Sequence, residues 1–139
     1  MNPDTLTKKI EQLKEYLVKA KELARETSEE ILSDFRHYHA AERLFQLIVD
    51  TCVDINVHLI RERVSKAPDD LQSTFIVLGE AGILDKDFAI KLAPVVGLRN
   101  RIIHRYDTLN RSEFIEMLKK ELTDFDAYHN VVLALAKQE

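Results

Sequence analysis

The sequence of 139 residues contains no tryptophan, one cysteine, three glycines and three prolines. Because glycine and proline are the main residues that end helices, their scarcity indicates long helices, and we expect an all-α chain. Cys52 has no second cysteine with which to form an intrachain disulfide. Its apolar neighbours indicate a buried core residue in a protein of the reducing cytoplasm.

The sequence also lacks a long apolar run and a strong excess of charge. No apolar stretch approaches the ~20 residues of a transmembrane helix, and the N-terminus lacks the pattern of a signal peptide. We therefore expect a cytoplasmic protein with no membrane contact. Twenty basic and 24 acidic residues give a net charge of −4, so any contact with RNA must be local. The length predicts a single domain over residues 1–139.

Hydrophobic periodicity predicts a bundle of four long helices with one short insert helix. The first helix begins at Asn2 and Pro3. It is expected to bury Leu6, Ile10, Leu13, Leu17, Ala20 and Ala24. The second begins at a capping box formed by Thr27 and Glu30 and continues to about Arg63. We expect a bend or break within residues 36–41, because His37, Tyr38 and His39 are poorer helix formers than their neighbours.

The insert helix is expected over residues 69–80, with Leu71, Phe75 and Leu78 directed inward and Gly82 just beyond its end. Asp85 then caps the third long helix, and Pro94 predicts a kink inside it. Asn110 is expected to cap the last helix. Its predicted inward side chains are Phe114, Leu118, Leu122, Phe125, Val132 and Leu135.

The third long helix ends in the stretch 97–106, which combines apolar and cationic residues. Leu98, Ile102 and Ile103 predict a buried stripe, whereas Arg99 and His104 lie outside it. Histidine can transfer a proton at a 2′-hydroxyl or a leaving oxygen, and arginine can neutralise charge on a phosphoryl group. This pair indicates cleavage of RNA phosphodiesters without a metal or cofactor. The structural alternative is a surface arginine followed by a capping histidine.

Helix geometry restricts how these side chains meet. Arg99 and His104 are about 140° apart around a regular helix, whereas Asn100 and His104 share a face. Three arrangements remain open. The kink at Pro94 redirects Arg99, the two residues flank a cleft from opposite edges, or a second copy of the chain supplies the complementary residue.

Other polar groups were also considered. Asp50, Asp54 and His58 are spaced as a metal or acid–base line, but a polar stripe facing the cleft or a dimer seam is the simpler interpretation. His129 is expected at the surface. Six arginines either converge into a basic patch or act as separate surface residues: Arg61, Arg63, Arg99, Arg101, Arg105 and Arg111.

The run from Arg99 through His104 to Tyr106 resembles the Arg-x4-His-x-Tyr motif of HepT toxins, a branch of the HEPN superfamily. The resemblance extends over essentially the whole chain in order and spacing. It includes residues 42–46, 54–60, 68–78 and 82–84. It implies a HEPN-like up-and-down helical bundle that forms a homodimer, so that two copies of the motif line one cleft.

The resemblance further implies the toxin of a type VII-like toxin–antitoxin module, acting as a metal-independent ribonuclease. Arg99 would stabilise phosphate charge, and His104 would be general acid or base. Asn100 and Arg101 would support them. An antitoxin nucleotidyltransferase of the MntA type would transfer AMP to Tyr106. Two alternatives remain: a noncatalytic partner or substrate subunit of such a nucleotidyltransferase, and a plain helical interaction module.

Overall fold

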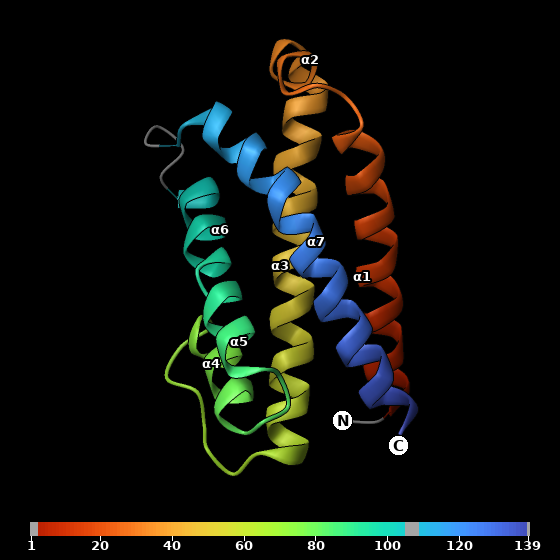
Figure 1. Ribbon diagram of the computed structural model, residues 1–139, viewed down its shortest axis with the longest axis vertical. Helices are drawn as coiled ribbons and strands as arrows, with labels where there is room; N and C mark the ends of the chain where they lie inside the picture. Colours follow the sequence, from red (N-terminus) through yellow and green to blue (C-terminus); the bar gives the residue numbers. More distant parts are fainter. Residues whose placement is uncertain (1–2, 105–108, 139) are drawn as a thin grey trace.

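The structure, a computed structural model, describes residues 3–104 and 109–138, and all regular secondary structure in these ranges is α-helical. The helices are α1 (Pro3–Ala24), α2 (Ser28–Ser33), α3 (Phe35–Arg63), α4 (Ser73–Glu80), α5 (Lys86–Leu92), α6 (Val95–His104) and α7 (Arg111–Lys137). Figure 1 shows α3 at the centre, with α1 on one side and α6 on the other, while α7 crosses the bundle obliquely. The predicted all-α bundle is confirmed.

The first helix is amphipathic, as its sequence pattern predicts. Ala24 packs at the edge of the core. The other five expected core residues are buried: Leu6, Ile10, Leu13, Leu17 and Ala20. This stripe packs against both α3 and α7, which explains why three long helices share one core. Asn2, the predicted N-cap, lies outside the described residues.

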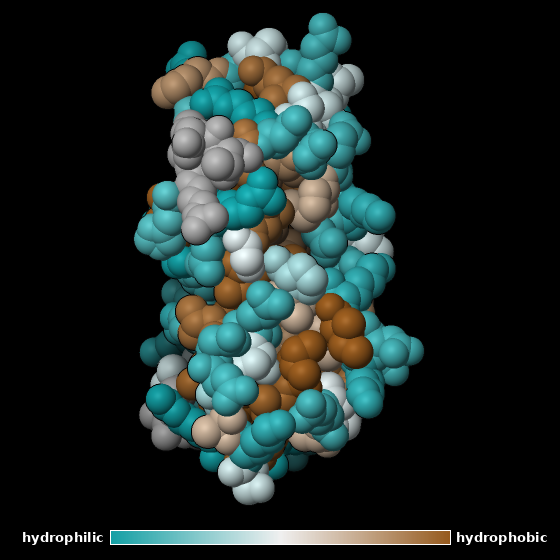
Figure 2. Space-filling model, turned by 90° about the vertical axis from the view of Figure 1, so that its left-hand side faces the viewer, coloured by the Kyte–Doolittle hydropathy of each residue, from teal (hydrophilic) through white to brown (hydrophobic). Residues whose placement is uncertain are grey.

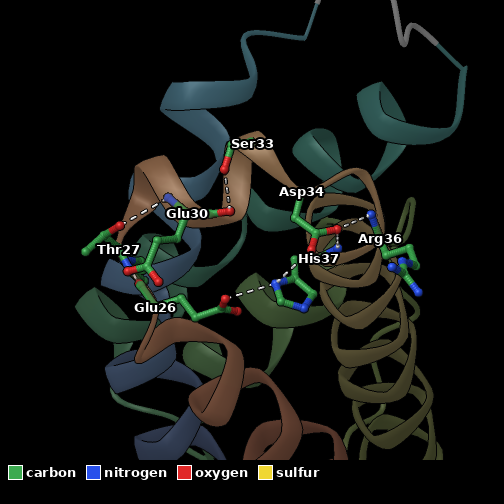
Figure 3. A network of polar contacts seen from close by, with 8 residues as sticks. Glu26, Thr27, Glu30, Ser33, Asp34, Arg36 and His37 are labelled. Atoms are coloured by element: carbon green, nitrogen blue, oxygen red, sulfur yellow. Dashed lines mark hydrogen bonds and ion pairs between the residues drawn. The ribbon is translucent and has the colours of Figure 1, made fainter.

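The second predicted helix is divided into α2 and α3. The capping box at its start is confirmed, because Thr27 Oγ1 accepts from the Glu30 amide and Glu30 Oε1 accepts from the Thr27 amide, both at 3.1 Å. The break lies at Asp34, whose backbone is extended (φ −111°, ψ 110°), and therefore precedes the predicted range of 36–41. Figure 3 shows both caps.

The position of this break follows from capping. Asp34 Oδ1 accepts hydrogen bonds from the amides of Arg36, at 2.9 Å, and His37, at 3.4 Å. These bonds satisfy two amides that have no partner in the first turn of α3. His37 Nδ1 also lies 2.9 Å from Glu26 Oε1 (Figure 3). An aspartate cap thus outweighs the low helix propensities three to five residues later.

The core of the bundle contains aromatic rings in edge contact. The Phe45 ring of α3 lies 5.6 Å from the Phe114 ring and 6.1 Å from the Phe125 ring, both on α7. Cys52, on the same side of α3, is fully buried, and burial raises the pKa of its thiol. The interpretation of Cys52 as an inert core residue is confirmed.

A buried polar network joins three helices inside this core. The Tyr128 hydroxyl of α7 lies 2.6 Å from Asn56 Oδ1 and 3.0 Å from the Cys52 carbonyl oxygen, both on α3. Asn56 Nδ2 donates to Thr74 Oγ1 of α4 at 3.1 Å, and Thr74 donates to the Leu71 carbonyl at 2.7 Å. The side-chain oxygen and nitrogen atoms of Tyr128, Asn56 and Thr74 in this network all have partners, which limits the cost of their burial.

The insert helix is shorter than predicted. It begins at Ser73, after a turn in which Asp70 Oδ1 accepts from the Ser73 amide at 2.8 Å and Ser73 Oγ accepts from the Asp70 amide at 3.0 Å. Leu71 falls in this turn and is 53% exposed, so its predicted inward position is wrong. Phe75 and Leu78 are buried as expected. Gly82 has a φ of 78°, the left-handed conformation expected just after a helix.

The third predicted helix is also divided. Asp85 caps α5 by accepting from the Phe88 amide at 3.1 Å, as predicted. The chain then leaves the helix at Ala93 and Pro94 and resumes as α6, so Pro94 produces a break and not the expected kink. The helix that carries Arg99 and His104 is therefore only ten residues long.

The last helix begins as predicted, with Asn110 Oδ1 accepting from the Glu113 amide at 3.0 Å. Its predicted core residues Phe114 through Val132 are buried, and Leu135 packs at the edge of the core. The surface position predicted for His129 is wrong, because this side chain is buried between α7 and α1. Burial, together with the nearby positive charge of Lys14, lowers the pKa of His129.

None of the helices in the described ranges combines the length and the apolar character that a bilayer-spanning segment requires.

Candidate functional site

Helix α6 presents the candidate site by burying only part of its circumference. Val95, Val96 and Ile102 are buried, and α6 packs against α3. Leu98 is half-buried, whereas Ile103 is 37% exposed, so the prediction that Ile103 belongs to the buried stripe is wrong. With this face against the bundle, α6 leaves Asn100, Arg101 and His104 exposed to solvent.

Arg99 is directed to α3 and forms an ion pair with Asp50. Its Nε lies 2.7 Å from Asp50 Oδ1, and its Nη2 lies 3.3 Å from Asp50 Oδ2. The third nitrogen, Nη1, donates to Asn100 Oδ1 at 3.2 Å. Two parallel bonds of this kind fix the plane of a guanidinium group. Arg99 therefore has a defined orientation before any ligand binds.

His104 lies at the end of α6, in a depression that it shares with Gly97, Asn100 and Arg101. We call this hollow the His104 depression. Arg99 does not line it. The structure thus brings Asn100, Arg101 and His104 together, as their spacing along a helix predicts, and directs Arg99 to a neighbouring stripe of the helix.

This geometry removes one of the three arrangements considered for Arg99 and His104. Pro94 precedes the first residue of α6, and both side chains belong to the same uninterrupted helix. The break therefore reorients the whole of α6 and leaves the angle between the two residues unchanged. A cleft with Arg99 and His104 on opposite edges, or a second copy of the chain, remains.

Tyr106 and Arg105 fall within residues 105–108, outside the described residues. The role predicted for Tyr106 stays a prediction.

The line of Asp50, Asp54 and His58 does not converge on a common point. Asp50 contacts Arg99 of α6, Asp54 Oδ2 lies 3.1 Å from Lys9 Nζ of α1, and His58 Nε2 lies 3.2 Å from Glu62 Oε1. Within residues 3–104 and 109–138 no group of three or more histidine, cysteine, aspartate or glutamate side chains is placed to hold a metal ion. The polar-stripe interpretation is the one that the contacts support.

Of the six arginines considered for a basic patch, the five that the structure describes do not all converge, and Arg105 lies outside the described residues. Arg61 and Arg63 lie in the last turn of α3, at the bottom of Figure 1, whereas α6 ends and α7 begins near its top. Arg111, in the first turn of α7, places its guanidinium carbon 4.6 Å from the centre of the Tyr38 ring. The described arginines of one copy therefore do not form a single patch, while the pairings expected for separate surface arginines stay a prediction.

Sequence reasoning missed the pairing of Arg99 with Asp50. The two residues are 49 positions apart, and the only signal was that Asp50 lies on a polar stripe of a largely buried helix.

A family model described as Ribonuclease HepT-like matches residues 7–132 of the chain. The chain is similar to the tRNA nuclease HepT of Aphanizomenon flos-aquae, with 30% identity over 128 residues that cover 92% of this chain and 87% of that protein. It is also similar to the mRNA nuclease HepT of Shewanella oneidensis, with 27% identity over 64% of this chain and 67% of that protein.

The fold is similar to that of a solved structure of a tri-AMPylated HEPN toxin from Shewanella oneidensis, determined in complex with an MNT antitoxin. The TM-score is 0.86, the superposition covers 96% of this chain and 99% of the other, and 24% of the residues are identical.

Proposed function

The chain belongs to the HepT-like ribonuclease family, and on this premise we propose that it is the toxin of a toxin–antitoxin module that cleaves RNA through Arg99 and His104. The observation that carries the proposal is the family match over residues 7–132, which includes the whole of α6. The exposed position of His104 at the end of that helix supports it.

In the proposed reaction, His104 and Arg99 have separate tasks. The His104 imidazole takes the proton from a ribose 2′-hydroxyl, whose oxygen then attacks the neighbouring phosphorus, or it gives a proton to the departing 5′-oxygen. The Arg99 guanidinium neutralises the charge that develops on the phosphoryl oxygens. Asp50 holds that guanidinium in one orientation. Asn100 and Arg101 contact the RNA backbone beside His104. No step requires a metal ion.

A second copy of the chain completes the proposed site. Arg99 and His104 lie on different stripes of one regular helix, so a single copy does not direct both side chains at one phosphate. In a symmetric dimer, Arg99 of one copy and His104 of the other face each other across the shared cleft. The angle between the two residues supports this arrangement.

The proposed control of this site is covalent. A nucleotidyltransferase, encoded by the gene next to that of this protein, transfers AMP from ATP to the Tyr106 hydroxyl oxygen and releases pyrophosphate. Tyr106 is two residues from His104, so an added adenylate brings negative charge and bulk to the place where the RNA phosphate binds. The AMPylated toxin–antitoxin structure from Shewanella oneidensis supports this proposal.

The proposal is tested by RNA cleavage with purified protein in excess chelator. We expect the wild type to cut RNA and to arrest growth on expression, and both His104→Ala and Arg99→Ala to be at least a hundredfold slower. His37→Ala and Arg61→Ala are the matched controls, since one lies at the start of α3 and the other in an exposed turn at its far end. A wild type that neither cuts RNA nor slows growth supports the noncatalytic partner instead.

The modification is tested by intact mass after co-expression with the neighbouring gene. An increase by one or more AMP units is expected for the wild type and not for Tyr106→Phe. An AMP adduct that persists on Tyr106→Phe assigns the modification to another residue.

A further inference from the structure

A groove between α6 and α7 lies directly beside the His104 depression. It has a volume of about 600 Å³. Its apolar walls are formed by Pro94 and Leu98 on the α6 side and by Phe114 and Met117 on the α7 side. Figure 2 shows this side of the molecule, where apolar side chains are visible in hollows between polar ones. Gly97 and Arg101 line both the groove and the His104 depression, so the two hollows adjoin.

The polar groups of the groove are arranged along its length. Because α6 and α7 run in opposite directions, Arg101 and Glu113 lie toward the end that carries His104, and Glu121 lies toward the other end. That far end is bordered by Lys91 of α5, whose Nζ is 3.2 Å from Asp124 Oδ2 of α7.

Glu121 has an unsatisfied acceptor. Its Oε2 atom is buried and accepts no hydrogen bond from any residue that the structure describes. Burial, and then the charge of Asp124, raise the pKa of Glu121, and a hydrogen bond between the two carboxyl groups raises it further. The side chain as a whole is only partly buried and lines the groove, so its carboxylate is the acceptor that an N–H group of a ligand in the groove meets.

We infer that this groove is a nucleobase subsite, in which one base of the RNA inserts between α6 and α7 while the adjoining phosphate lies at Arg101 and His104. A base is flat and uncharged, which suits a groove with apolar walls whose two ends each carry one cation and one carboxylate. The Glu121 carboxylate at the far end of the groove accepts from an amino group on the base edge. The inference rests on the proposed ribonuclease function and adds a substrate contact to it.

The base edge gives the subsite a preference. Cytosine carries an exocyclic amino group where uracil carries a carbonyl oxygen. A carboxylate at this end of the groove therefore attracts cytosine, and adenine or guanine by the same contact, and disfavours the carbonyl edge of uracil.

The test measures the binding of CMP, UMP and ribose 5-phosphate to the full chain, because these probes separate base from phosphate without requiring cleavage. We expect CMP to bind about tenfold more tightly than ribose 5-phosphate, the size of one base-stacking contribution, and more tightly than UMP. Equal affinities for CMP and ribose 5-phosphate would overturn the inference.

Two substitutions in the groove avoid Arg99 and His104. Met117→Trp fills the groove, and is expected to reduce CMP affinity to that of ribose 5-phosphate and leave the latter unchanged. Met117→Leu is the matched control that keeps the volume. Glu121→Met removes the acceptor at similar length, and is expected to abolish the preference for CMP over UMP. The subsite would be contradicted if Met117→Trp bound CMP as tightly as the wild type, or if the substitution changed the oligomeric state and nothing else.

RNA cleavage by the same proteins separates this inference from the proposed function. If the wild type binds CMP with the expected preference but cuts no RNA, the subsite is supported and the proposed ribonuclease activity is contradicted. If the wild type cuts RNA but binds the three probes equally, the ribonuclease activity is supported and the subsite is contradicted.

Discussion

Arg99 of α6 and Asp50 of α3 form a two-point ion pair, with nitrogen–oxygen distances of 2.7 and 3.3 Å. The Arg99 side chain is 23% exposed and that of Asp50 is 42% exposed, so solvent screens the pair and its contribution to stability is at most about 1 kcal/mol. Its main effect is orientation. The guanidinium that the proposed reaction requires is held by a helix other than its own.

Asp50→Ala is therefore expected to reduce RNA cleavage by roughly 10- to 100-fold while changing the free energy of unfolding by no more than about 1 kcal/mol. Asp50→Asn keeps one acceptor for Arg99, so its rate of RNA cleavage is expected to lie between those of Asp50→Ala and the wild type. The loss should appear in kcat, because an unheld guanidinium binds phosphate but stabilises the transition state less. Faster cleavage by Asp50→Ala would instead make Asp50 an inhibitory partner.

Mixing two inactive variants tests the contribution of the second copy. Arg99→Ala and His104→Ala chains, unfolded and refolded together, form mixed dimers in which one Arg99–His104 pair across the interface is intact. Random assortment then restores about a quarter of wild-type activity. Each variant refolded alone provides the control. No recovery in the mixture, with dimers present by light scattering, would contradict catalysis across the interface.

The buried network around Tyr128 is expected to affect stability and not cleavage. Tyr128→Phe removes the hydroxyl that lies between Asn56 Oδ1 and the Cys52 carbonyl. Because the acceptors stay buried without their donor, we expect a loss of about 1–3 kcal/mol in the free energy of unfolding, measured with urea. Tyr16→Phe, at a less buried tyrosine, is the control and should change stability little.

The buried His129 predicts a stability that depends on pH. Its folded-state pKa is lowered from 6.5, so below pH 6.5 the unfolded chain binds a proton more readily than the folded one. Stability is therefore retained above this value and declines as the pH falls toward the folded-state pKa. His129→Gln should show a shallower decline of Tm between pH 7 and 5. An equal decline in both proteins would assign the pH dependence to other groups.

Local signals in the sequence predicted local structure well. The caps at Thr27, Asp85 and Asn110 and the left-handed Gly82 were all identified correctly, because each depends on residues within one turn. The break between α2 and α3 was misplaced, since the cap that Asp34 provides acts more strongly than the propensities that were used to place it.

Features that depend on tertiary packing could not be predicted. The burial of His129 depends on α1 packing against α7, and the contact of Asp50 with Arg99 joins residues 49 positions apart. The exposure of Ile103 follows from how α6 sits on α3. The groove between α6 and α7 requires residues of three helices and of the segments that flank them, and no periodicity within one helix indicates it.

The central claim is that His104 catalyses attack by a ribose 2′-hydroxyl without a metal ion. The most direct measurement is cleavage, in excess chelator, of a short RNA that the wild type cuts at one position, compared with the same RNA carrying a single 2′-deoxyribose there. We predict that the wild type cuts only the all-ribose substrate and that His104→Ala cuts neither. Cleavage of the deoxy-substituted RNA, or undiminished cleavage by His104→Ala, would contradict the account.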